Sequence, residues 1–270
     1  QGRARLDQLK LDLDSLKVDG SGWATLDARG LVQFEGQGRT AVDANRVARA
    51  LQAWKIVTLD MEGQTSAQAK VRWSRSGGLE LDGSAQVDQP RWHGARADQV
   101  LAKVVEIRGS DLWIKNIEVT KDQGSGGGDL WLTWGRTAPG QPQMDMCYTA
   151  HRLPVAEGLR AADLKDEDGK DLPITGIGSG WVRLHGPFAN LSMYGAAQAE
   201  QGEVYGIKIP AASSDFSMDI EALRMQLTGV RVAERPDLLG QGDAPPEGGL
   251  ALQGRADMDF RGWTWWVDLA

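Results

Sequence analysis

Cysteine and clustered histidine are nearly absent from this sequence. Cys147 is the one cysteine among 270 residues, which excludes an intrachain disulfide and any metal site built from several thiolates. The three histidines, His93, His151 and His185, are far apart and show neither H-x-x-x-H nor carboxylate spacing. This pattern indicates neither a zinc site nor a Ser-His-Asp triad, so we expect no bound metal and no cofactor.

Long apolar runs and basic clusters are absent as well. No run of about 18 apolar residues occurs, so we expect no transmembrane helix in this stretch. The formal net charge is −7 and the basic residues are scattered singly, which argues against a nucleic-acid partner. The sequence has no G-x-S-x-G motif, and a catalytic carboxylate pair cannot be recognised among 37 acidic residues. We therefore expect a protein that is not an enzyme.

Two short motifs look like ligand-binding loops but have the wrong context. Gly176, Gly178 and Gly180 form G-x-G-x-G, whereas a nucleotide loop has a different spacing and opens a helix. A strand pattern follows these glycines, so we interpret them as a turn that leads into a strand. The acidic run Asp166–Gly169 lacks the first and last carboxylates of a calcium loop, and we interpret it as a solvated acidic turn.

What the sequence does contain is period-2 alternation of apolar and polar residues. Leu9, Leu11 and Leu13 alternate with lysine and aspartate, and similar short runs recur along the whole chain between glycine-rich or charged turns. Such runs predict strands with one apolar face. Two stretches instead show helical spacing, and they predict short helices near residues 44–54 and 153–164.

The order of these signals repeats along the chain. The two helical stretches, and several apolar positions after them, recur at an interval of about 110 residues. We therefore predict one continuous β-repeat array over residues 1–270. Residues 1–42 are the tail of a preceding repeat, 43–150 and 151–260 are two repeats, and 261–270 begin the next. This organisation also leads us to expect that the chain is an internal piece of a longer protein.

The expected fold is mainly β: an elongated, curved, mostly antiparallel sheet with two short helices. A two-layer sandwich would show the same alternation strand by strand and remains an alternative. If the sheet curls about its long axis, its apolar faces line a groove. Alternation assigns the following residues to that groove: Leu11, Leu81, Val104, Leu132, Val182, Ile207, Met225 and Leu252. Tryptophan outnumbers phenylalanine and tyrosine together, and we assign Trp23, Trp181 and Trp265 to the groove rim, where an indole contacts both apolar material and water.

One stretch carries a family resemblance. A short helix is followed by Leu-Pro-Ile-Thr-Gly at Leu172–Gly176, by Gly-Ser-Gly and a strand, and by Gly-Gly-Leu-x-Leu-x-Gly at Gly248–Gly254. This order resembles the long β-rich envelope proteins typified by TamB and the wider AsmA-like group. The resemblance implies a taco-shaped β-sheet with a hydrophobic groove, in a periplasmic protein that an N-terminal helix anchors to the inner membrane. It also implies a link to phospholipid transport and to the assembly of outer-membrane proteins. This stretch contains neither the anchor helix nor a recognisable segment for an outer-membrane partner.

The resulting expectation is a segment that carries phospholipid between the inner and outer membranes and supports outer-membrane assembly. Its partners would be phospholipid acyl chains and outer-membrane assembly proteins. The alternative is an extracellular or periplasmic β-repeat scaffold with a closed core, which binds polysaccharide or a protein partner.

Overall fold

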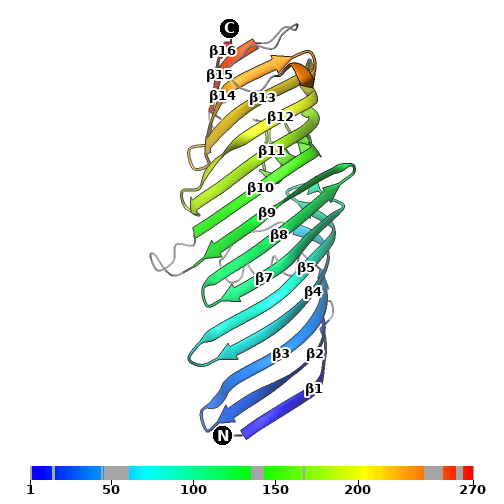
Figure 1. Cartoon of the computed structure of the whole chain (residues 1–270), viewed down its shortest axis with the longest axis vertical. Coiled ribbons are helices and arrows are strands. Elements are labelled where there is room, and N and C mark those ends of the chain that lie inside the picture. The colour runs from blue at the N-terminus through cyan, green and yellow to red at the C-terminus, as the bar shows by residue number, and fades with distance from the viewer. Residues whose placement is uncertain are drawn as a thin grey trace. The chain divides into compact units, whose positions relative to one another are not determined.

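The computed structural model describes residues 2–13, 16–43, 45, 61–134, 143–166, 168–239, 252–259 and 264–269. For some of these, including Leu11, Leu252 and Trp265, only the backbone is described. The chain is mainly β, and every strand pairing in the described register is antiparallel, which confirms the predicted fold class. The chain divides into two compact units, and its strands are long and bent (Figure 1).

The first unit comprises Gln1–Trp92, Arg96–Thr120 and Gly128–Pro142. Its strands are hydrogen-bonded in sequence order, from β1 through β5 to β7, β8 and β9. The strands are β1 (Gly2–Leu13), β2 (Leu16–Asp27), β3 (Gly30–Asp43), β4 (Met61–Ser74), β5 (Gly78–Trp92), the two-residue β6 (Ala95–Arg96), β7 (Gln99–Arg108), β8 (Asp111–Lys121) and β9 (Gly124–Thr133).

The second unit comprises His93–Ala95, Lys121–Gly127 and Gln143–Ala270, and its strands β10 to β16 also pair in sequence order. Short turns join most of these strands. The elements are β10 (Gln143–Pro154), α2 (Val155–Ala161), β11 (Ile174–Pro187), β12 (Ser192–Val204), β13 (Ile207–Asp219), β14 (Arg224–Ala233), the 3-10 turn η1 (Pro236–Leu238), β15 (Leu252–Asp259) and β16 (Thr264–Leu269). The division into two units does not test the predicted repeat boundaries, which stay a prediction.

Bulges keep the apolar residues of a strand on one side of the sheet. In β8, Leu112 and Ile114 occupy even positions, whereas Ile117 and Val119 occupy odd ones, so the sequence changes phase. Asn116 lies between the two pairs and has a positive φ of 54°. At the same height in the sheet, the pairing of β5 with β7 shifts its register. One extra residue reverses the side to which later side chains point, so the bulge returns the second pair to the same face.

The helical predictions have different outcomes. The helix predicted near residues 153–164 is present as α2, with Leu153 and Pro154 forming the end of β10 instead. Helix α2 is short and packs on β10 and β11. The helix predicted near residues 44–54 lies almost wholly outside the described residues, which there include only Asn45.

The interpretation of Gly176, Gly178 and Gly180 as a turn is wrong. Strand β11 begins at Ile174, so all three glycines lie within the strand. The physical reason is close approach: a Cβ atom added at Gly178 would lie 3.2 Å from a methyl group of Val155 in α2. Glycine here leaves room for the helix on the sheet rather than turning the chain.

Fully buried apolar residues are few among those described, and they do not form one large core. The clearest cluster is Ala211, Ala233 and Leu239, which are 0%, 2% and 4% exposed. Because η1 follows β14, it brings Leu239 onto the two alanines of β13 and β14. Most of the large apolar side chains lie instead on a partly exposed sheet face.

Candidate apolar binding faces

Each unit carries an apolar face that runs across its strands. Residues that pair directly in an antiparallel ladder lie on the same side of the sheet, so the register identifies these faces. In the first unit, Val71 pairs with Leu81, Leu81 pairs with Ile107, and Ile107 pairs with Leu112. The large members of this apolar face are Phe34, Val71, Trp73, Leu79, Leu81, Val87, Val100, Val105, Ile107, Leu112, Ile114, Ile117 and Val119.

The apolar face of the first unit is only partly shielded from solvent. Its large side chains are half-buried, and Leu79 is 39% exposed. The described elements of this unit pack on their neighbours in the sheet, and none of them forms a second layer over the face. A closed sandwich core would bury such residues nearly completely. Among the described elements, therefore, the face stays partly exposed and has no covering layer.

The apolar face of the second unit contains a row of methionines. The register pairs Met193 with Met218, Met218 with Met225, and Met225 with Met258. The row continues in the other direction through Leu184 to Met146. Neighbouring members of this apolar face are Met144, Tyr148, Val182, Phe216, Leu227 and Ala256.

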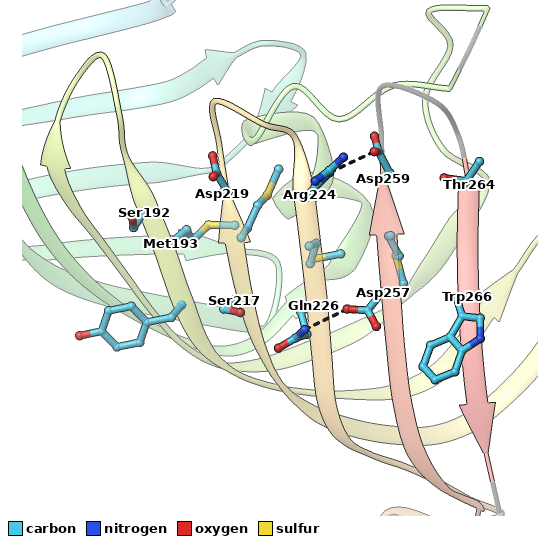
Figure 2. A pocket seen from close by; sticks show the side chains of 14 residues that line it. Ser192, Met193, Ser217, Asp219, Arg224, Gln226, Asp257, Asp259, Thr264 and Trp266 are labelled. Atoms are coloured by element: carbon cyan, nitrogen blue, oxygen red, sulfur yellow. Dashed lines mark hydrogen bonds and ion pairs between the residues drawn. The ribbon is translucent and has the colours of Figure 1, made fainter.

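A hollow of about 630 Å³ adjoins strands β12 to β16 (Figure 2). Four methionines of the row line it, together with polar residues that alternate with them along the same strands. Two polar pairs are among the residues that adjoin it: Arg224 contacts Asp259 at 3.1 Å, and the side-chain amide of Gln226 donates to Asp257 at 2.9 Å. The lining residues thus come from both faces of these strands, with the methionines on the apolar face and the two polar pairs on the other.

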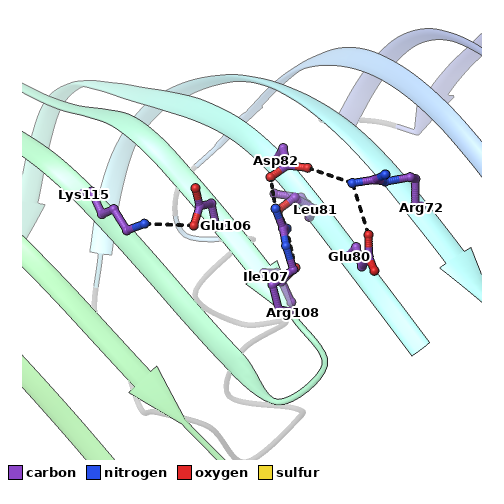
Figure 3. A network of polar contacts seen from close by, with 8 residues as sticks. All are labelled: Arg72, Glu80, Leu81, Asp82, Glu106, Ile107, Arg108 and Lys115. Atoms are coloured by element: carbon purple, nitrogen blue, oxygen red, sulfur yellow. Dashed lines mark hydrogen bonds and ion pairs between the residues drawn. The ribbon is translucent and has the colours of Figure 1, made fainter. Parts of the chain in front are cut away.

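The opposite face of each sheet is polar and carries cross-strand ion pairs. In the first unit, Arg72 contacts Glu80 at 3.2 Å and Asp82 at 3.6 Å, and Asp82 also pairs with Arg108 (Figure 3). The hydrogen bond that Arg108 donates to Asp82 is the main cause that raises the pKa of Arg108. Because these groups are partly exposed, each pair contributes little to stability. Their main effect is to keep this face hydrated and the two faces chemically distinct.

The polar face of the second unit combines an ion pair with aromatic rings. Arg183 donates to both carboxylate oxygens of Asp145, at 3.0 and 2.8 Å, and this contact lowers the pKa of Asp145. Tyr194 meets Trp181 and His185 edge-to-face, with ring centroids 5.8 and 5.6 Å apart. The edge-to-face geometry is a favourable one for aromatic pairs, and Trp181 stays 43% exposed.

The predicted groove residues fall into three groups. Leu81, Val182 and Met225 lie on the apolar faces. Val104 pairs with Lys115 beside the β7 bulge, so the register puts it on the polar side, and Ile207 lies at a turn where it is 68% exposed. For the remaining three, Leu132 is buried in β9, whereas Leu11 pairs with Val18 and Leu252 pairs with Val232. The structure describes only the backbone of Leu11 and Leu252, so their prediction stays a prediction.

Two of the three predicted rim tryptophans, Trp23 and Trp181, do not border the apolar faces in the described register. Trp23 pairs with Arg5 and Glu35, and the guanidinium of Arg3 lies 4.3 Å from its ring centroid. Trp181 pairs with Thr149 on the polar face. Trp265 pairs with Met258, and its side chain lies outside the described set. Trp23 and Trp181 therefore belong to polar surfaces, where a cation or another ring covers part of the indole.

The methionine row was not predicted from the sequence, although the sequence contains a signal for part of it. Met218 and Met225 flank the turn between β13 and β14 at matching distances, so a hairpin necessarily pairs them. Met193 and Met258 come from other hairpins, and nothing local in their sequences fixes their register with this pair. A row across six strands, β10 to β15, becomes visible only when the whole ladder is known.

The described residues contain no group of three or more histidine, cysteine, aspartate or glutamate side chains that would hold a metal ion. Within the same part of the chain, no helix has the length and apolar character needed to cross a membrane. The chain was compared with protein-family models, with curated proteins and with solved structures, and none of them matches it.

Proposed function

We propose that the apolar faces bind the acyl chains of phospholipids and that the chain serves as a passive path for lipid. The observation that carries this proposal is the continuity of each apolar face across several strands while its side chains stay only half-buried. Burying one methylene group is worth about 0.8 kcal/mol, so even part of an acyl chain on such a face is bound appreciably.

The chemistry of the faces also supports movement along them. Successive strands lie about 4.8 Å apart and offer similar apolar side chains, so a chain moving from one strand to the next loses little contact at any step. Among the described residues, the ion pairs lie on the polar faces, so the apolar faces offer no fixed charge there that would hold a headgroup in one place. Transfer would then be driven by the difference in lipid chemical potential between the two ends.

The cellular location of the chain and its role there are proposed on the family resemblance alone. On that basis the chain is a stretch of a periplasmic envelope protein that carries phospholipid between the inner and outer membranes and supports outer-membrane assembly. The proposal assigns no catalytic chemistry to the chain.

Paired aspartate substitutions test whether the apolar faces hold lipid. Leu81→Asp and Val182→Asp place a charge on the apolar faces, and Ser84→Asp and Thr149→Asp place the same charge on the polar faces of the same units. Each protein is stripped of lipid, incubated with phosphatidylethanolamine vesicles, separated from them and measured by native mass spectrometry without detergent.

We expect the wild-type chain and the two polar-face variants to retain phospholipid, and the two apolar-face variants to lose most of it with unchanged circular dichroism. Absence of lipid from the wild-type chain would contradict the proposal. Global unfolding of both apolar-face variants would favour a closed core instead, because a buried aspartate is strongly destabilising in such a core.

A second candidate function has a separate basis on the polar face. The exposed ring of Trp181, next to Tyr194 and His185, is a surface on which the apolar side of a sugar ring can stack while neighbouring polar groups bind its hydroxyls. Under this alternative the chain is a binding scaffold for polysaccharide. Affinity electrophoresis in gels that contain neutral polysaccharide tests it, with Trp181→Ala expected to abolish any retardation and Leu81→Asp expected to leave it unchanged.

A further inference from the structure

The methionine row concentrates one kind of side chain in one place. The sequence has seven methionines, and five of them, Met146, Met193, Met218, Met225 and Met258, belong to the single cross-strand row in the second unit. By contrast, the first unit contains a single methionine, Met61 in β4. A general need for flexible apolar filler would have spread methionine over both faces.

Four members of the row lie on consecutive strands without interruption. Directly paired residues of an antiparallel sheet have Cβ atoms about 4.5–5.5 Å apart. A methionine side chain is unbranched and has three rotatable bonds, so its sulfur atom can reach toward either neighbour. Three adjacent members, such as Met193, Met218 and Met225, are therefore within reach of a common point above the sheet. Figure 2 shows Met193 at one side of the hollow that these residues line.

Every methionine of this row offers the same kind of ligand atom, a thioether sulfur. Thioether sulfur is a soft, uncharged donor that favours Cu(I) over harder ions. The carboxylates of Asp219, Asp257 and Asp259 alternate with the methionines along their strands, so they project from the opposite face. Calcium and magnesium require oxygen ligands, and zinc sites use thiolate, imidazole or carboxylate groups, so the row offers these ions no suitable donors.

We propose that Met193, Met218, Met225 and Met258 form a binding site for a soft monovalent cation, Cu(I), which three of their thioether groups coordinate at a time. Met218 is only 7% exposed and forms the floor, whereas its half-buried neighbours can reorient around the ion. The site is independent of the lipid-binding proposal, because it requires the register of the methionines and not an acyl chain on the face.

The test uses the full chain with Cys147→Ser as background, because Cys147 is an exposed thiol and would bind Cu(I) by itself. Under anaerobic conditions, lipid-free protein competes for Cu(I) with a chromophoric bicinchoninate chelator. The test variant carries Met193→Leu, Met218→Leu and Met225→Leu together, and a matched control carries Met61→Leu and Met144→Leu. Leucine preserves volume and apolar character, and circular dichroism verifies the fold of each protein.

The expected result is withdrawal of one Cu(I) per chain from the chelator by the background protein and the control, and loss of this withdrawal in the triple variant. X-ray absorption of the loaded protein should then show sulfur neighbours only. No competition with the chelator, equal binding by the triple variant, or nitrogen and oxygen neighbours would overturn the proposal. If the triple variant does not fold, the three single variants replace it, and each must bind Cu(I) more weakly than Met144→Leu.

Discussion

At several positions on the apolar faces, an aromatic ring occupies the space beside a glycine. A Cβ atom added at Gly195 would lie 2.9 Å from the Phe216 ring, and one added at Gly36 would lie 2.7 Å from the Phe34 ring. In the second unit the phenol of Tyr148 likewise occupies the space that a side chain at Gly126 would need. These glycines are part of the packing, because they let a ring lie flat against the sheet.

A pair of alanine substitutions separates this packing role from flexibility. An added methyl group at Gly195 would meet the backbone oxygen of Trp181 as well as Phe216, whereas one at Gly158 in α2 has nothing within 4 Å. We expect Gly195→Ala to lower the free energy of unfolding by about 1–3 kcal/mol. Gly158→Ala should raise it by about 0.5–1 kcal/mol, because alanine favours the helix. Urea denaturation measures both, and equal effects would argue against the packing role of Gly195.

Tyr148 provides a prediction at alkaline pH. Burial of its hydroxyl raises the pKa of Tyr148 to about 12, whereas the pKa of an unfolded tyrosine is about 10. A raised pKa means that the folded state holds the proton more tightly than the unfolded state. The stabilising contribution is therefore complete below pH 10 and is lost as the pH rises from about 10 to 12.

The comparison is between the wild-type chain and Tyr148→Phe, with urea unfolding measured at several pH values. We expect the wild-type chain to lose more stability than the variant between about pH 10 and 12, since phenylalanine has no proton to lose. Parallel alkaline slopes for the two proteins would show that Tyr148 titrates normally.

At the scale of elements, bulges decide which residues share a face. Gln89, Arg152 and Gln201 have positive φ angles within β5, β10 and β12, and each lies at or beside a register shift. Without such extra residues, the apolar positions beyond each shift would point to the polar side. The bulges therefore maintain the segregation of the two faces over strands that are long compared with the average strand of a globular protein.

Asn116 in β8 allows this role to be tested. Its φ is 54°, and its backbone amide donates to a carboxylate oxygen of Asp129 at 2.7 Å. Asparagine tolerates the left-handed region, glycine adopts it freely, and a β-branched residue does not. We expect Asn116→Val to lower the free energy of unfolding by about 1–2 kcal/mol, with Asn116→Gly close to the wild-type value. If thermal unfolding finds the two variants equally stable, the bulge does not depend on this conformation.

At the scale of the whole molecule, charge and apolar surface are kept on separate faces. The net charge is −7, yet the charged groups that form ion pairs, such as Arg72 with Glu80, lie opposite the apolar rows. A lipid bound through its acyl chains would therefore feel little direct electrostatic attraction. This separation leads to a prediction about ionic strength.

Retention of phospholipid should not fall as salt increases. Salt screens interactions between exposed charges over roughly 10 Å at 0.1 M, but it does not weaken apolar burial. We expect native mass spectrometry, after incubation in 0.05 M and 0.5 M sodium chloride, to show equal or greater retention of a zwitterionic phospholipid at the higher salt. A large loss at the higher salt would indicate that headgroup charge, not the acyl chain, dominates binding.

The sequence by itself determined the fold class and one face of most strands. Alternation is a local property, so Leu81 and Val182 could be assigned to the apolar side from their neighbours alone. The helical spacing after Leu153 likewise located α2, because the period of 3.6 differs clearly from that of a strand.

Only the tertiary structure decided the register, and with it the site. Val104 continues the alternation that begins at Val100, but the bulge in β7 pairs it with Lys115. The glycines of β11 read as a turn because the close contacts of Gly178 with α2, and of Gly176 and Gly180 with the backbone of β12, are not encoded by their immediate neighbours. The alignment of the methionines depends on every hairpin from β12 to β15 at once. Pairing between strands is set by turns, bulges and packing together, so residues far apart in the sequence become neighbours only in the folded sheet.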